Sequence, residues 1–346
     1  MATTETADPI AYFLQDLTYH GKSERTLVAY ERVLRRFEAY LADELGVPTP
    51  AAADRRACLS WIHELRSEAS RSTVATYASY LHRFYAYMTQ VGEFEANPMV
   101  LVMEELDESI DKDPARRDLS VDQMRAFVAG ITHPLDRAVV VTLLKTGMRI
   151  GELCNLDLRD LNLDDAAVES AYGVPPRVQL EDRPNTLYVA SDVSRGAVVN
   201  GEERTASNKR KRDTLVPVDT ELRAVLRRYL AIRPDADSPA EPLFCSTRDQ
   251  WGHRLKTGWA RSMVTGHARR VGWYRSGGSA AENVTPHYFR HFFTTHLRDR
   301  TGDRGIVKYL RGDVADDIID TYTHNWGDRV REVYEANIYA LTPFSG

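Results

Sequence analysis

Two short segments of the sequence place arginine and histidine side chains where they could hold a phosphate group. The segment TPHYFRHFFTTHL carries His287 and Arg290 three residues apart, which puts both side chains on one side of a helical turn. A guanidinium presents a planar fork of donors that fits two phosphate oxygens, and an imidazole can donate or exchange a proton near neutral pH. The segment TGMRIGELCNL adds Arg149, although an arginine shortly after a helix-ending glycine is more often a surface residue.

A metal site is the alternative interpretation of the histidines, because His291 lies four residues after His287. The zincin pattern would need a glutamate beside the first histidine, and Tyr288 occupies that position. We therefore favour a phosphate clamp over a metal pair.

A run of basic residues, NKRKRDTLVPV, precedes an expected strand and carries Lys209 and Lys211. Such a run is usually a solvated turn. The sequence contains only seven lysines, however, and two of them stand here within three residues. A lysine on a hairpin can enter a DNA groove, bring a point charge to a phosphate and donate a proton. Hairpin length decides which lysine reaches the phosphate, so the residues alone leave both Lys209 and Lys211 as candidates.

One tyrosine near the end of the chain, Tyr322 in LRGDVADDIIDTYTHNW, is a candidate nucleophile. Its spacing from Ile318 and Ile319 on a short helix is equally typical of a core residue. A phenol with a reference pKa of about 10 attacks poorly at pH 7 unless its anion is favoured. Clustered arginines would favour that anion.

The composition is that of an ordinary soluble protein that is long enough for two domains, with 346 residues, 43% apolar and 27% charged. No apolar run approaches the roughly 18 residues of a membrane span, and the start lacks the features of a signal peptide, so we expect a cytoplasmic protein.

Cys58, Cys154 and Cys245 lie far apart, as suits buried residues in a reducing compartment. The scarcity of lysine indicates a GC-rich or salt-adapted source, such as a salt-adapted archaeon.

The first part of the chain predicts a helical domain over residues 1–95. Apolar side chains recur at three- and four-residue steps in three segments, 23–45, 53–68 and 72–92. Residues 96–118 lose this periodicity and gain prolines and acidic residues, which predicts a linker.

The second part predicts a mainly helical domain over residues 119–346 with a small antiparallel sheet or hairpin. Ser120 and Gln123 form a capping-box pattern at its first helix, and 134–147 is a strongly apolar helix. Short β-like runs follow at 185–191 and 213–219. The polar stretch 164–205 is longer than most loops, and we interpret it as an insertion or β region.

Taken in order, Arg149, Lys209, His287-x-x-Arg290 and Tyr322 resemble the catalytic set of the tyrosine recombinases, the phage-integrase and Xer-like family. The surrounding segments TGMRIGEL, NKRKRDTLVPV, TPHYFRHFFTTHL and IIDTYTH resemble the family's boxes, and the N-terminal helices resemble its core-binding, SAM-like domain. The resemblance implies a two-domain, C-shaped clamp on double-stranded DNA that performs site-specific integration, excision or dimer resolution.

The resemblance also implies a role for each residue. Arg149 and Arg290 would hold the scissile phosphate, His287 would assist, and Lys209 would protonate the departing 5′-hydroxyl. Tyr322 would become a 3′-phosphotyrosine, with no ATP, metal or other cofactor. Family members act as homotetramers on paired sites, with no membrane or small-molecule substrate, and 331–346 is a candidate segment for docking on a neighbouring subunit.

The sequence departs from the family at Asp313, where a histidine or tryptophan is usual nine residues before the tyrosine. A carboxylate repels phosphate and cannot replace a donor. Either Asp313 and Asp316 start a helix as capping residues, or Arg311 supplies the missing donor. Asp313 keeps open a second function, a DNA-binding regulator that does not cut. A type IB topoisomerase-like activity also stays open, because such an enzyme would share the same chemistry.

Overall fold

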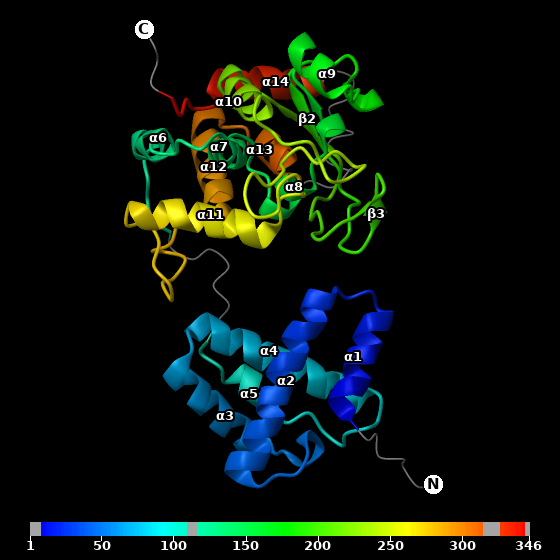
Figure 1. Cartoon of the computed structure of the whole chain (residues 1–346). Helices are drawn as coiled ribbons and strands as arrows, with labels where there is room; N and C mark the ends of the chain where they lie inside the picture. The colour runs from blue at the N-terminus through cyan, green and yellow to red at the C-terminus, as the bar shows by residue number, and fades with distance from the viewer. Residues whose placement is uncertain (1–7, 109–115, 314–325, 343–346) are drawn as a thin grey trace. The chain divides into compact units, whose positions relative to one another are not determined.

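The chain divides into two compact units, Met1–Pro114 and Ala115–Gly346, each described by itself (Figure 1). The computed structural model describes residues 8–108, 116–313 and 326–342. Both units are built mainly of helices, with small antiparallel sheets in the second, which confirms the predicted fold class. No helix among these described residues is long and apolar enough to cross a membrane.

The first unit is a group of helices around an aromatic core. Its helices are α1 (Pro9–Tyr19), α2 (Glu24–Leu45), α3 (Arg55–Glu68), α4 (Arg71–Gln90) and the short α5 (Val100–Glu104). The three predicted helices are present as α2, α3 and α4, and the side chains of Ser23, Asp54 and Ser70 accept hydrogen bonds at their N-termini. Phe37 and Trp61 pack edge to face at the centre of the core.

Two features of this unit differ from the sequence-based expectation. Helix α1 was not predicted; Asp8 caps it and its apolar face enters the core through Ile10 and Phe13. The expected linker 96–118 begins inside the unit, because Met99 and Val102, at the start and within α5, are buried in the same core.

The second unit is built around α7 (Pro134–Thr146), whose residues from Leu135 to Thr146 are buried except Arg137. The other helices are α6 (Val121–Ala129), α8 (Ile150–Asn155), α9 (Ala166–Tyr172), α10 (Thr220–Leu230), α11 (Thr257–Arg270), α12 (Pro286–Thr301), α13 (Arg304–Arg311) and α14 (Trp326–Asn337). The predicted capping box is present: Ser120 and Gln123 exchange side-chain to backbone hydrogen bonds before α6.

Gly147 ends α7 in the left-handed conformation, with φ of +61°. A Cβ atom there would lie 2.2 Å from the ring of Phe293 in α12, so the position accepts only glycine. This close approach brings the turn before α8 against α12, and these two elements carry Arg149 and Arg290.

The main sheet of this unit has the strand order β1 (Leu161–Asn162), β2 (Thr186–Val189) and β5 (Thr214–Pro217), all antiparallel. Leu187 pairs with Val216 in the centre of β2 and β5. The predicted strands at 185–191 and 213–219 are therefore present but shorter. Strand β5 leads directly out of the basic run that carries Lys209.

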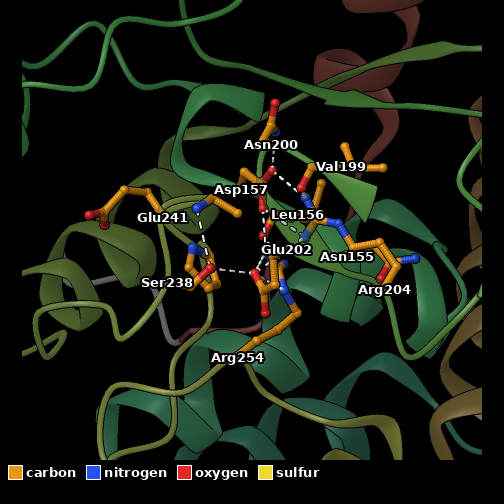
Figure 2. Close-up of polar contacts among 12 residues, drawn as sticks. Asn155, Leu156, Asp157, Val199, Asn200, Glu202, Arg204, Ser238, Glu241 and Arg254 are labelled. Atoms are coloured by element: carbon orange, nitrogen blue, oxygen red, sulfur yellow. Dashed lines mark hydrogen bonds and ion pairs between the residues drawn. The ribbon is translucent and has the colours of Figure 1, made fainter. Parts of the chain in front are cut away.

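Residues 164–205 form α9, β2 and a second hairpin of β3 (Val198–Val199) and β4 (Glu202–Glu203). Figure 2 shows the buried ion-pair network that holds this hairpin. The guanidinium of Arg204 binds both carboxylate oxygens of Asp157, at 3.0 and 2.6 Å, and Arg254 joins Asp157 to Glu202 at 2.6 and 2.7 Å. Because buried charges need such pairing, this segment is fixed to the body of the unit.

The end of the described chain packs on its own unit. Val330 and Tyr334 of α14 and the following Tyr339 and Leu341 are buried in the core, and the Tyr334 hydroxyl donates to the carbonyl of Lys145 at 2.9 Å. Docking of 331–346 on a neighbouring subunit stays a prediction, because the structure contains a single chain. Residues 343–346 lie outside the described part of the chain.

Candidate active site

Arg149 stands at the N-terminus of α8, where a buried glutamate fixes it. The carboxylate of Glu152 accepts from the backbone N–H of Arg149 at 2.9 Å and from its Nη1 at 3.0 Å. The same Nη1 donates to the carbonyl of Lys209 at 3.1 Å, which ties the basic run to this turn. The other end of the fork, Nη2, is directed at Asp313 and lies 3.0 Å from its Oδ1.

The basic run is anchored by its middle residue, Arg210, whose side chain is fully buried. Its Nε donates to Glu152 at 3.2 Å and its Nη1 to the carbonyl of Leu310 at 2.9 Å. Lys209 and Lys211 flank Arg210 and are both exposed. Both lysine side chains reach solvent, so both remain candidate proton donors.

Arg290 projects from α12 and is 3% exposed. Its Nη1 donates to the carbonyls of Gly147 and Arg311, at 2.7 and 3.0 Å, and its Nη2 donates to Asp313 at 2.7 Å. Burial lowers the pKa of the guanidinium to about 10; Asp313 opposes this shift, whereas Arg149 adds to it. Arg290 is still charged at pH 7 and is paired with Asp313.

The carboxylate of Asp313 is paired with three arginines. Its Oδ1 accepts from Arg149 and Arg290, and its Oδ2 lies 2.9 Å from Nη2 of Arg311 in an ion pair. The cluster of Arg149, Arg290, Arg311 and Asp313 is called the arginine cluster below. With Arg210 and Glu152 behind it, four guanidinium groups face two carboxylates, so positive charge is in excess. The arrangement is an anion-binding site.

His287 lies at the start of α12, where burial and the charge of the arginine cluster shift the pKa of its imidazole. Partial burial lowers the pKa of its imidazole, and Arg116, Arg290 and Arg149 lower it further. His287 is therefore neutral at pH 7 and can donate one hydrogen bond and accept another.

Helix α12 carries two further histidines, His291 and His296, and His296 makes its contacts outside the arginine cluster. Its Nε2 lies 3.2 Å from the carbonyl of Leu119, and its ring packs on Phe292. Among residues 8–108, 116–313 and 326–342, no group of three or more His, Cys, Asp or Glu side chains is placed to hold a metal ion. All three cysteines are buried and free, as predicted.

The structure thus brings together Arg149, Arg290, His287 and the backbone of Lys209, together with Arg311. Tyr322 lies outside the described residues, and so does the helix that Asp313 and Asp316 were expected to cap; both stay predictions. The sequence analysis missed Glu152 and Arg210. Glu152 had a detectable signal, since a glutamate three residues after a helix start is typical of an N-terminal cap.

Two family models match the chain. The phage integrase N-terminal SAM-like domain matches residues 10–92, and the phage integrase family matches residues 189–328. The second match includes Lys209, His287, Arg290 and Tyr322, whereas Arg149 lies before it. Together the matches span more than half of the chain.

Individual proteins of known type are similar over nearly the whole chain. Tyrosine recombinase XerC of Pelobacter propionicus is 26% identical and covers 96% of both chains. The Tn1549 transposon integrase, solved in complex with a circular intermediate DNA, has a TM-score of 0.65 at 18% identity, covering 94% of this chain and 99% of its own. A lambda integrase tetramer on a Holliday junction has a TM-score of 0.60 at 15% identity, covering 89% and 77%. The chain belongs to the phage integrase family of tyrosine recombinases.

Proposed function

We propose that this chain is a site-specific DNA recombinase that cuts and rejoins strands through a 3′-phosphotyrosine at Tyr322. The observation that carries the proposal is the arginine cluster, in which three guanidinium groups converge on one carboxylate in the unit that holds the family's motifs. A site of this kind suits a phosphodiester, whose two non-bridging oxygens share one negative charge.

The reaction that follows is balanced without a co-reactant. The oxygen of Tyr322 forms a bond to phosphorus while the bond from phosphorus to the 5′-oxygen breaks. The phenol gives up its proton, and the 5′-oxygen takes one from Lys209 or Lys211. The phosphoryl group gains negative charge on the way, which Arg149 and Arg290 neutralise.

His287 supports this chemistry as a neutral imidazole. Because its pKa is lowered, it can hydrogen-bond to a phosphate oxygen or accept the phenol proton without adding a charge in the resting site. Once a phosphate binds, the extra negative charge favours the protonated form and makes His287 a stronger donor.

We further propose that the chain works on double-stranded DNA in the cytoplasm as a homotetramer on paired sites. Support comes from the lambda integrase tetramer on a Holliday junction, which shares the fold.

The test is formation of a covalent DNA adduct. Nicked suicide duplexes tiling the DNA on either side of the gene are incubated with the purified protein, and adducts are scored on denaturing gels. We expect an adduct at one duplex that Tyr322→Phe abolishes while a gel shift shows that binding is kept. Specific binding without any adduct would indicate a DNA-binding regulator instead. Relaxation of any supercoiled plasmid, without site preference, would indicate a topoisomerase.

A further inference from the structure

We propose that Arg311 is a third ligand of the scissile phosphate, and that the Asp313 carboxylate occupies the place of this phosphate until DNA enters. The inference rests on the proposed function, because it concerns the same anion site. It assigns a role to two residues at the point where the sequence departs from the family pattern.

The carboxylate of Asp313 is bound in the way a phosphodiester would be. One oxygen accepts from Arg149 at 3.0 Å and from Arg290 at 2.7 Å, while the other oxygen faces Arg311 at 2.9 Å. A phosphodiester likewise presents two oxygens that share a charge, and guanidinium groups bind carboxylate and phosphate through the same donors. The Nη2 atoms that a phosphate needs are therefore those that Asp313 now holds.

Both the backbone and the side chain of Arg311 belong to this site. Its carbonyl accepts from Nη1 of Arg290 at 3.0 Å, so the position of one arginine fixes the other. Its Nε is buried and has no hydrogen-bond partner among residues 8–108, 116–313 and 326–342. A buried donor without an acceptor is costly, and an oxygen of a bound phosphate would satisfy it.

A phosphate and the Asp313 carboxylate cannot share the site, because two like charges at hydrogen-bonding distance repel strongly. The aspartate can leave without disturbing the fold. Its side chain is 27% exposed, and its backbone is held separately by the hydrogen bond from its N–H to the carbonyl of Lys308 at 3.1 Å. Binding of DNA therefore requires only that this carboxylate swing out toward solvent.

Occupation of the site by Asp313 weakens phosphate binding until DNA is bound. While Asp313 is in place, its carboxylate occupies the Nη2 donors that a phosphate would use, so the chain binds free phosphate weakly. A phosphate delivered by bound DNA, at high local concentration, displaces the carboxylate.

The experiment measures binding of inorganic phosphate to the full chain by isothermal titration at constant ionic strength. The variants are Asp313→Asn, which keeps the shape but removes the charge, and Arg311→Ala and Arg311→Lys, each made in the wild-type and Asp313→Asn backgrounds. Arg304→Ala is the matched control, since Arg304 is exposed at the other end of α13. Thermal unfolding in chloride checks that every variant is folded.

We expect Asp313→Asn to bind phosphate at least about tenfold more tightly than the wild type, because a like charge is removed. In that background, Arg311→Ala should lose about tenfold, Arg311→Lys should recover part of the loss as a point charge, and Arg304→Ala should change nothing. Unchanged affinity in Asp313→Asn would refute the competition. Unchanged affinity on adding Arg311→Ala would refute the third ligand.

Failure of the proposed function looks different from failure of this inference. Phosphate binding does not depend on strand cleavage, so the predicted affinity changes without any DNA adduct would contradict the recombinase proposal alone. An adduct together with unchanged phosphate affinities would contradict only the roles of Arg311 and Asp313.

Discussion

The carboxylate of Asp313 accepts a 2.7 Å hydrogen bond from Nη2 of Arg290, which is almost fully buried in α12. A carboxylate at this position would repel a phosphate if it stayed in the site, yet it is also what holds the arginine in place when no phosphate is present. The residue that seemed to argue against catalysis therefore marks the anion site, and its pairing supplies the counter-charge of the buried Arg290 guanidinium.

Replacing Arg311 should separate cleavage from DNA binding. We expect Arg311→Ala to slow cleavage of a suicide duplex by about a hundredfold, because one donor to the transition-state phosphoryl group is lost. Gel-shift affinity should change little, since Arg311 would contact only one phosphate of the duplex. Cleavage within about twofold of the wild type would rule out a catalytic role for Arg311.

Glu152 should be essential for stability, because its fully buried carboxylate pairs with Arg149 and Arg210. Glu152→Gln leaves Arg210 buried without its counter-charge, and we expect the free energy of unfolding to fall by about 3 kcal/mol. Urea denaturation measures this change. Glu169→Gln, at an exposed position of α9, is the control and should stay within about 0.5 kcal/mol of the wild type.

Two glycines offer a matched comparison of backbone strain and packing. Gly302 and Gly312 both end helices in the left-handed region, at φ of +65° and +69°. An added Cβ meets nothing within 4 Å at Gly302, whereas at Gly312 it would lie 2.6 Å from Cγ of buried Arg210.

The left-handed backbone should lower the free energy of unfolding of both alanine variants by about 1 kcal/mol, but only Gly312→Ala must also displace Arg210. We expect its free energy of unfolding to lie at least about 1 kcal/mol below that of Gly302→Ala. Equal losses in urea denaturation would mean that Arg210 is not fixed where the structure has it.

The pKa of His287 should depend on the charge of the arginine cluster. Its pKa is lowered in the folded protein, so the folded state binds fewer protons than the unfolded chain as pH falls below the ordinary value of 6.5. The neutral imidazole therefore stabilises the fold above pH 6.5, and this contribution is lost as pH falls toward the folded pKa.

Phosphate should raise this pKa, because an anion offsets the neighbouring arginines. NMR titration of the imidazole resonances, assigned by comparison with His287→Asn, measures the pKa with and without phosphate. A pKa at or above 6.5 in the free protein, or one that phosphate does not move, would contradict the proximity of His287 to the cluster.

Much of the site could be predicted because its residues lie in local patterns. The helix that carries His287 and Arg290, the glycine stop before Arg149 and the strand after Lys209 all follow from spacing within short segments. The partners of Asp313 could not, since Arg149 is 164 residues away and the contact depends on how α8, α12 and α13 pack. Only the fold brings these charges together.

The C-terminal segment carries a local pattern that the sequence analysis did not use. Val330 and Tyr334 are four residues apart, the spacing of a helix face that must be buried, and the chain buries it in its own core. Helix α1 was missed although Asp8 and Pro9 form a typical helix start. In both places the capping and spacing signals were present in the sequence.

The most direct test of the account is whether a purified covalent adduct can rejoin DNA. The adduct is isolated from a suicide duplex and given a complementary strand with a free 5′-hydroxyl, with EDTA present and ATP omitted. If Tyr322 stores the phosphodiester bond, the strands should be joined and the protein released in equal amounts. An adduct that persists, or that is hydrolysed without joining the strands, would contradict the account.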